Sequence, residues 1–316
     1  MRAAISFVCV SLGISLGISG WSYGEAFPMH ASAPMARDQA VSEADRWLAQ
    51  ARQLALRERP LEAYKAAQKA ISRYEDALRL GGEDPELHYR AVVASDLYVN
   101  ASTPPRDWRA IIRHAEAFRT ADPLDPRDDF LTPILCHALA HEAGQGGADS
   151  AELFARGIAE YERWFFHLDQ TDPWIATSLG VDYMNLAELL MAVGKLEEAT
   201  DYYRMATPMN TGRLGALPYY GLAVAYDRAG QFERAGESMR RALELDSDSS
   251  QLHDPDVYFV PAGDVHYYEA LAHQIAGRPA AAATSYRLFL SEAVKVQDRY
   301  RLRARAHLEE LRGSSR

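Results

Sequence analysis

The fold of this 316-residue chain is decided by residues 219–243, YYGLAVAYDRAGQFERAGESMRRAL. A first apolar run ends at Gly230, and a second run begins at Ala235 and continues with Met239 and Ala242. Because steps of four and three residues return to the same face of a helix, the second run predicts one helix with a packed face. Glycine is the residue that most readily ends a helix in a tight turn. The stretch therefore predicts two helices that turn at Gly230 and pack against each other.

The same spacing occurs six times in the chain: a small residue, a bulky residue four positions later, and a third residue, usually alanine, three positions beyond that. The six copies are Ala70/Tyr74/Ala77, Ala110/His114/Ala117, Gly157/Tyr161/Trp164, Ala199/Tyr203/Ala206, Ala235/Met239/Ala242 and Ala282/Tyr286/Phe289. Small residues let a neighbouring helix approach closely, and the bulky side chain fills the space beside it. No stretch alternates with period two over more than a few residues, and the most β-like stretch is Val257 to Val260. The chain is therefore predicted to be all-α, built from consecutive helix pairs and without a sheet.

The helix that precedes each of the last three copies also repeats. These helices carry Leu186, Ala187, Leu190 and Gly194, then Leu222, Ala223, Tyr226 and Gly230, then Ala270, His273 and Gly277. With these residues the sequence resembles the tetratricopeptide repeat family, closely over Tyr183–Ala206 and Tyr219–Leu243 and with a departure at Glu269 in the last copy. The three earlier copies match mainly in the second helix. The resemblance implies an α-solenoid of about six helix pairs over residues 41–290, followed by a capping helix and tail over residues 291–316.

In this family the first helices line a concave groove that binds extended or helical peptide segments. The residues that the resemblance places in the groove are Met184, Glu188, Met191, Tyr220, Asp227, Tyr267 and Gln274. Sulfur, aromatic rings, an amide and a few acids suit an apolar or mildly basic segment. The alternative is that these side chains pack between adjacent repeats. Most of the basic and asparagine residues with which some members bind a chaperone carboxylate are missing, although Asn185 is present. We therefore expect a non-enzymatic scaffold whose partner is a protein or peptide.

Residues 1–24 are predicted to be a secretory signal peptide. No charged residue lies between Arg2 and Glu25, and Ala3–Ile18 is a short apolar segment interrupted by serines. Because this segment falls short of a full apolar span, a permanent membrane helix or uncleaved anchor is the weaker interpretation. Residues 25–40 are predicted to be flexible. These features predict an exported protein of the bacterial periplasm or cell envelope, with no integral membrane span after signal cleavage.

Charge and cysteine content argue against two further classes of function. The chain has 34 Lys and Arg against 44 Asp and Glu, a net charge of −10. This is the wrong sign for a surface that follows nucleic-acid phosphates, so we expect no nucleic-acid partner. The only cysteines are Cys9 and Cys136, and signal cleavage leaves Cys136 alone. The mature chain is therefore expected to lack an internal disulfide even in an oxidising compartment.

Candidate catalytic chemistry is confined to one predicted helix. His137 and His141 are four residues apart, so both imidazoles could face one metal ion. Their order differs from the HExxH zinc motif, and no third ligand is evident nearby. The neighbouring Cys136 lies in an apolar segment rather than beside a base. Since P-loop, GxGxxG and GxSxG motifs are absent from the sequence as well, we assign no catalytic residue, no metal ligand and no cofactor.

Two other functions stay open at this point. A metal-binding or hydrolytic protein would use the His137/His141 helix, and a self-assembling structural subunit would stack through the edges of its solenoid. The oligomeric state is not predicted. The connection before the last helix pair carries Tyr258 and Phe259 among turn residues. These rings either pack back onto neighbouring helices, which we favour, or form one wall of a binding surface.

Overall fold

The computed structural model describes residues 33–96, 107–167, 173–210, 212–254, 257 and 259–313. Within these ranges every regular element is a helix, which confirms the predicted all-α architecture. The α-helices are α1 (Ala33–Leu56), α2 (Pro60–Gly81), α3 (Pro85–Asp96), α4 (Trp108–Ala121), α5 (Asp128–Gly144), α6 (Ser150–His167), α7 (Pro173–Val193), α8 (Leu196–Ala206), α9 (Leu217–Arg228), α10 (Phe232–Leu245), α11 (Val265–Ile275), α12 (Pro279–Glu292) and α13 (Asp298–Gly313). The connections contain the short 3-10 helices η1 (Gly212–Leu214), η2 (Ser250–His253), η3 (Ala262–Asp264) and η4 (Lys295–Gln297).

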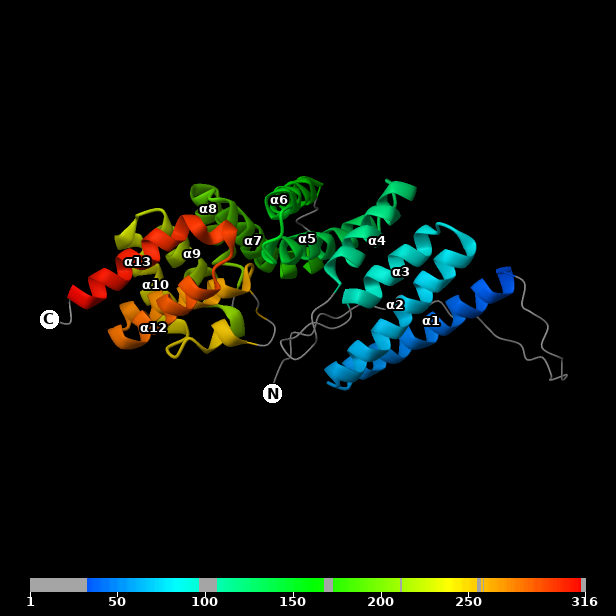
Figure 1. The fold of residues 1–316 in the computed structure, drawn as a ribbon, viewed down its shortest axis with the longest axis horizontal. Helices are drawn as coiled ribbons and strands as arrows, with labels where there is room; N and C mark the ends of the chain where they lie inside the picture. The colour runs from blue at the N-terminus through cyan, green and yellow to red at the C-terminus, as the bar shows by residue number, and fades with distance from the viewer. Residues whose placement is uncertain are drawn as a thin grey trace.

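The helices follow one another in pairs along the long axis of the molecule (Figure 1). The two helices of each pair pack together, from α1 with α2 to α11 with α12, and each second helix also contacts the first helix of the next pair. First helices contact one another as well: α3 with α5, α5 with α7, α7 with α9, and α9 with α11. This arrangement is an α-solenoid, in which the first helices form one face and the second helices the other.

The repeated triads form the contacts within this solenoid. All of their side chains are buried except Ala117, which is half-buried. Fully burying one apolar side chain such as Phe289 stabilises a fold by roughly 1.5–3 kcal/mol. The six triads are therefore a main source of the packing free energy that holds consecutive helices together.

The last three pairs turn at glycines, as the sequence predicts. Gly194, Gly230 and Gly277 have φ angles of 87°, 76° and 69°. These angles lie in the left-handed region, where a residue with a Cβ is strained and glycine is not. The glycines thus let each first helix end abruptly and reverse into its partner.

Helix α1 begins earlier than predicted. Residues 33–40, which the sequence places in a flexible segment over 25–40, are the first turns of α1. Ala40 is buried in one cluster with Tyr74 of α2 and Leu87 of α3. The prediction is wrong for these turns because contacts with two later helices stabilise them, and those contacts are not visible in the local sequence. The part of the segment before α1 lies outside the described residues.

The described residues include only part of the two ends of the chain. The predicted signal peptide, residues 1–24, lies outside the described residues. The predicted capping helix is α13, and residues 314–316 of the tail are not described. Among the helices that are described, none combines the length and the apolar character needed to cross a membrane.

Candidate partner-binding groove

The residues predicted to line the groove lie on α7, α9 and α11, the first helices of the last three pairs. The side chains of Met191, Tyr220, Asp227 and Tyr267 are each at most 2% exposed. The expectation of an open groove is therefore wrong for these four, which are contacts inside the protein. The physical reason is that α13 and the connection before α11 return across the first helices, which the repeat pattern does not encode.

Asp227 is the centre of the contact between α9 and α13. Arg303 Nη2 lies 2.8 Å from Asp227 Oδ1, and His307 Nε2 lies 3.0 Å from Asp227 Oδ2. The Tyr267 hydroxyl of α11 donates to the same carboxylate over 2.6 Å. Burial alone would raise the pKa of Asp227, but the hydrogen bonds from His307 and Arg303 outweigh it and bring the pKa down to about 2. Asp227 is thus a buried anion that depends on Arg303 and His307 of α13 for its hydrogen bonds.

Tyr300 makes a second contact between α13 and the first helices. Its hydroxyl donates to the carbonyl of Met191 at the end of α7. The Arg228 guanidinium of α9 lies 4.0 Å from the Tyr300 ring centroid and 4.7 Å from that of Tyr267, close enough for cation–π attraction to both rings. One buried layer of rings and charges therefore joins α13 to α7, α9 and α11.

The connection between the last two helix pairs covers another part of the predicted groove. Val260 is buried, and its N–H donates to Glu188 Oε1 over 3.0 Å. Phe259 packs against the Tyr268 ring with the centroids 4.8 Å apart, so inward packing is confirmed for this ring, while Tyr258 lies outside the described residues. Burial raises the pKa of Glu188 to about 8. This carboxyl is therefore mostly protonated at neutral pH and binds the chain's own backbone.

The other predicted groove residues also have partners within the chain. Met184 is half-buried against the core. The Tyr220 hydroxyl donates to the Asp246 carbonyl over 3.0 Å. Gln274 is half-buried, and its Oε1 accepts a hydrogen bond of 3.1 Å from the Tyr286 hydroxyl. The groove of the last three pairs is thus filled by segments of the same chain.

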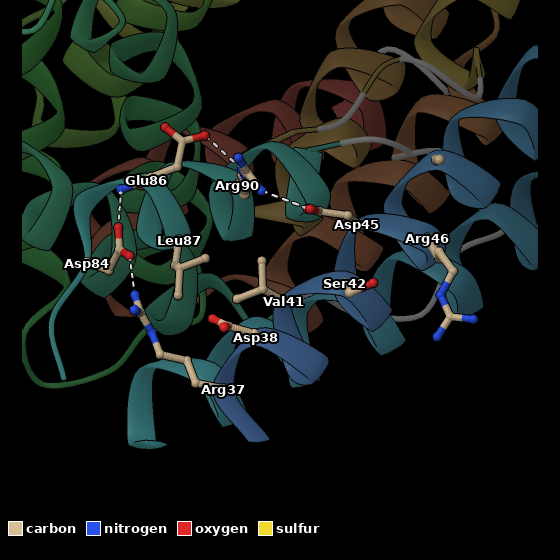
Figure 2. A pocket seen from close by; sticks show the side chains of 11 residues that line it. Arg37, Asp38, Val41, Ser42, Asp45, Arg46, Asp84, Glu86, Leu87 and Arg90 are labelled. Carbon is tan, nitrogen blue, oxygen red and sulfur yellow. Dashed lines mark hydrogen bonds and ion pairs between the residues drawn. The ribbon is translucent and has the colours of Figure 1, made fainter. Parts of the chain in front are cut away.

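An open groove of about 680 Å³ lies instead at the other end of the solenoid, between α1 and α3 (Figure 2). Contact between these two first helices is less extensive than between the later ones, which leaves the space open. Its lining from α1 is Arg37, Asp38, Val41, Ser42, Asp45, Arg46 and Ala49, and its lining from the α3 side is Asp84, Glu86, Leu87 and Arg90. The α1 residues recur at steps of three and four, so they share one helix face.

Two ion pairs cross this α1/α3 groove. Arg37 of α1 pairs with Asp84 just before α3. Arg90 Nη1 of α3 lies 2.9 Å from Asp45 Oδ1 of α1, and Arg90 Nε lies 2.8 Å from Glu86 Oε1. Both bridges are partly exposed, so each contributes only about 0–1 kcal/mol to stability. Their role in the groove is to neutralise two of its arginines.

The centre of the α1/α3 groove is acidic and apolar. Asp38, Val41 and Leu87 lie between the two bridges, while Arg46 points away from them (Figure 2). Asp38 is exposed and forms no ion pair within the described part of the chain. The lining has four carboxylates and three guanidinium groups, and Arg127 outside it also pairs with Glu86, so Asp38 is the carboxylate that gives the centre of the groove its acidic character.

The two imidazoles singled out in the sequence meet in the structure. His137 Nε2 and His141 Nε2 are 3.0 Å apart, and His141 stacks on Trp108 with the centroids 4.4 Å apart. Over the described ranges, no group of three or more His, Cys, Asp and Glu side chains is arranged to hold a metal ion. Cys136 is fully buried, and burial raises the pKa of its thiol. These residues therefore act as a polar and aromatic contact between α4 and α5.

Two features of the site were missed by sequence reasoning: the α1/α3 groove and the cover provided by α13. Part of the second was visible, because Tyr300, Arg303 and His307 follow one another at steps of three and four and so share a helix face. Their partners were not visible, since Asp227 lies 76 residues before Arg303. Pairings at this separation come from the packing of the whole solenoid.

Comparison with known proteins finds a family match over the helix pair α9 and α10. The family model of the tetratricopeptide repeat matches residues 217–249, which confirms the resemblance at the stretch that predicts the fold. The crystal structure of YrrB, a TPR protein with an unusual peptide-binding site, is similar with 16% identity and a TM-score of 0.45, over 72% of this chain and 99% of that chain. The crystal structure of MamA protein is similar with 17% identity and a TM-score of 0.37, over 61% and 85% of the two chains. The P58(IPK) TPR domain follows with 14% identity and a TM-score of 0.36, over 87% and 67%. No curated protein sequence matches the chain.

Proposed function

Because the chain carries tetratricopeptide repeats, we propose that it is a non-enzymatic scaffold that binds a segment of a protein partner in its α1/α3 groove. One observation carries the choice of this site. The groove of the last three helix pairs is filled by α13 and by the connection before α11, whereas the α1/α3 groove is open over about 680 Å³. A partner therefore meets accessible side chains of first helices at the amino-terminal end of the solenoid.

The lining of the α1/α3 groove defines the partner's chemistry. A lysine or arginine of the partner would pair with Asp38, and small apolar residues would contact Val41 and Leu87. The lining on α1 runs from Arg37 to Ala49, a helix length of about 18 Å at ~1.5 Å per residue. An extended segment covers that length with about five or six residues at ~3.3 Å each. The partner segment is therefore short and mildly basic.

We also propose that the protein acts outside the cytoplasm, in the bacterial periplasm or cell envelope. The support is the amino-terminal sequence, in which a short apolar segment follows a single arginine. Fusing residues 1–40 to alkaline phosphatase tests this, because that reporter needs disulfides that form only after export. We expect activity from this fusion and none when Ala3–Ile18 is deleted. Equal activity from the two fusions would contradict export by this segment.

Binding in the α1/α3 groove can be tested with defined peptides. The probes are fluorescein-labelled ten-residue peptides in which lysine or arginine alternates with alanine, valine or leucine, beside matched peptides with glutamate in the basic positions. We expect fluorescence anisotropy to show binding of the basic set only, weakening as salt screens the charges. Asp38→Lys should reduce the affinity at least tenfold, because it places a positive charge in the groove that repels the basic peptide.

The matched control is Asp201→Lys, which makes the same charge change on the exposed surface of α8. It should leave peptide binding unchanged. If both variants lose affinity equally, the peptides bind the acidic protein as a whole and the groove assignment is wrong. If none of the basic peptides binds the wild-type chain, the proposed partner chemistry is wrong.

A further inference from the structure

Helix α13 lies in the C-terminal half of the solenoid (Figure 1) and packs on α12, while its side chains reach the first helices that would line a repeat groove. It reaches α7 through the hydrogen bond from Tyr300 to the Met191 carbonyl, and α9 through the ion pair of Arg303 with Asp227. We propose that α13 is an intramolecular ligand that closes a second, helix-binding groove, and that a partner helix with the same pattern of side chains displaces it. This groove is distinct from the α1/α3 groove, so neither proposal rests on the other.

The contact between α13 and this second groove combines apolar and polar side chains. Tyr300, Ala304 and Leu308 are buried in the hydrophobic core, so a helix that replaces α13 must bury apolar surface of its own as well. His307 and Arg303 both bind the Asp227 carboxylate, and the His307 ring stacks on Tyr286 with the centroids 4.8 Å apart. Polar groups that leave such a contact regain hydrogen bonds to water, so the net contribution of each is small. Asp227, however, is 2% exposed and cannot be left without a cation. The groove therefore exchanges α13 only for a segment that brings its own basic side chains.

The charges of the two surfaces are complementary. The segment of α13 from Asp298 to Gly313 has five arginines against three acids, whereas the chain as a whole has a net charge of −10. A helix in this groove has to place a cation against the buried Asp227, as Arg303 does. It also has to place a ring over the Arg228 guanidinium, as Tyr300 does. The partner is thus a basic helix with an aromatic ring, an arginine three residues later and a second hydrogen-bond donor four residues after that.

The attachment of α13 explains why a competing helix is at a disadvantage. Only residues 293–297 connect α12 to α13, so α13 is always held close to its groove. Short tethers of this kind give effective concentrations in about the millimolar range. A free helix of equal intrinsic affinity therefore competes only when the contact of α13 itself is weakened.

The experiment therefore compares binding of a free helix to the wild-type chain and to a chain whose α13 contact is weakened. The probe is a fluorescein-labelled peptide of residues 294–313, added to the full-length chain. Arg303→Glu in the chain places a second carboxylate against Asp227 and releases α13, while the peptide supplies an intact arginine. We expect the peptide to bind this variant at least tenfold more tightly than the wild-type chain. Arg305→Glu is the matched control, because Arg305 is exposed on the same helix; binding to it should equal binding to wild type.

The remaining outcomes also decide the proposal. A probe that itself carries Arg303→Glu should fail to bind the Arg303→Glu chain. If circular dichroism shows that Arg303→Glu is unfolded, Arg303→Gln removes the charge without reversing it and carries the same expectation. The proposal is overturned if the peptide binds a folded Arg303 variant no better than wild type, or if Arg305→Glu gives the same gain. Asp38→Lys should not change binding of this probe, so failure here is separate from failure of the α1/α3 groove.

Discussion

Arg228 and Asp264 form an ion pair inside the protein, with side chains that are 0% and 3% exposed. Arg228 Nη2 lies 2.8 Å from Asp264 Oδ1, and Nη1 lies 3.0 Å from Oδ2, so the guanidinium binds the carboxylate through two parallel bonds. Gln297 Nε2 also donates to Asp264 Oδ1, over 2.5 Å. One buried carboxylate thus joins α9 to η3 and to the residue that precedes α13.

Asp264→Asn is expected to lower the free energy of unfolding by about 3–5 kcal/mol, because it leaves Arg228 as an unpaired buried cation. Urea unfolding followed by circular dichroism measures the loss. Asp201→Asn, which breaks an exposed pair with Arg204, should cost only about 0–1 kcal/mol. A loss below about 1 kcal/mol for Asp264→Asn would mean that Arg228 is hydrated and the pair is not enclosed.

Glu188 makes stability fall as the pH rises. Its pKa in the folded chain is about 8, above the ordinary value of 4.5, so the folded state holds a proton that the unfolded state has lost between these two pH values. Glu188→Gln keeps an acceptor for the Val260 N–H and removes the titration. Relative to wild type, the variant should therefore unfold at the same temperature near pH 4.5 and at a higher temperature at pH 8. Glu309→Gln, on the exposed surface of α13, should show no such divergence in thermal scans.

Gly221 and Gly236 provide a test of close helix packing. A Cβ on Gly221 of α9 would lie 2.1 Å from Tyr203 Cε1 of α8, whereas a Cβ on Gly236 of α10 would lie 3.5 Å from its nearest neighbour. Gly221→Ala should therefore destabilise the chain by about 1–3 kcal/mol through overpacking. Gly236→Ala should be neutral or stabilise by up to about 1 kcal/mol, because alanine favours the helix. Chemical denaturation of the two variants decides this; equal effects would contradict the close contact between α8 and α9.

His114 and His88 form a buried imidazole pair between α4 and α3. Their Nδ1 atoms are 2.8 Å apart, so one proton can lie between them. His88 Nε2 lies 2.5 Å from Glu83 Oε2, and His114 Nε2 lies 3.6 Å from Glu75 Oε1, while Arg113 adds a positive charge next to His114. Burial, and then the charge of His88, lower the pKa of His114.

A lowered pKa of His114 means that stability is lost on acidification. Below the ordinary value of 6.5 the unfolded state binds a proton more readily than the folded state, so the free energy of unfolding falls as the pH drops toward the folded-state pKa. His114→Gln should flatten this dependence between pH 7.5 and 5.5, measured by urea unfolding across that range. His167→Gln, at an exposed position, should leave the dependence unchanged. A pH profile of His114→Gln identical to that of wild type would contradict the assignment.

The parts of the fold that depend on local pattern were predictable. The triads at steps of four and three, and the glycines at the turns of the last three pairs, place each helix and its packed face from a few neighbouring residues. The first turns of α1 were not predictable in this way, because Ala40 is held by Tyr74 and Leu87. The same holds for the site. The sequence placed positions such as Asp227 on the inner face of the first helices, but it did not show that other parts of the chain bury them.

The amino-acid sequence by itself determined that this chain forms consecutive helix pairs with a common packed face, because that information repeats within each stretch of about forty residues. Only the tertiary structure decided which part of the inner face stays open. Arg303 meets Asp227 across 76 residues, and Val260 meets Glu188 across 72. Such contacts form when the solenoid has brought its first helices together, so they depend on the summed geometry of several helix pairs and not on the pattern of any one of them.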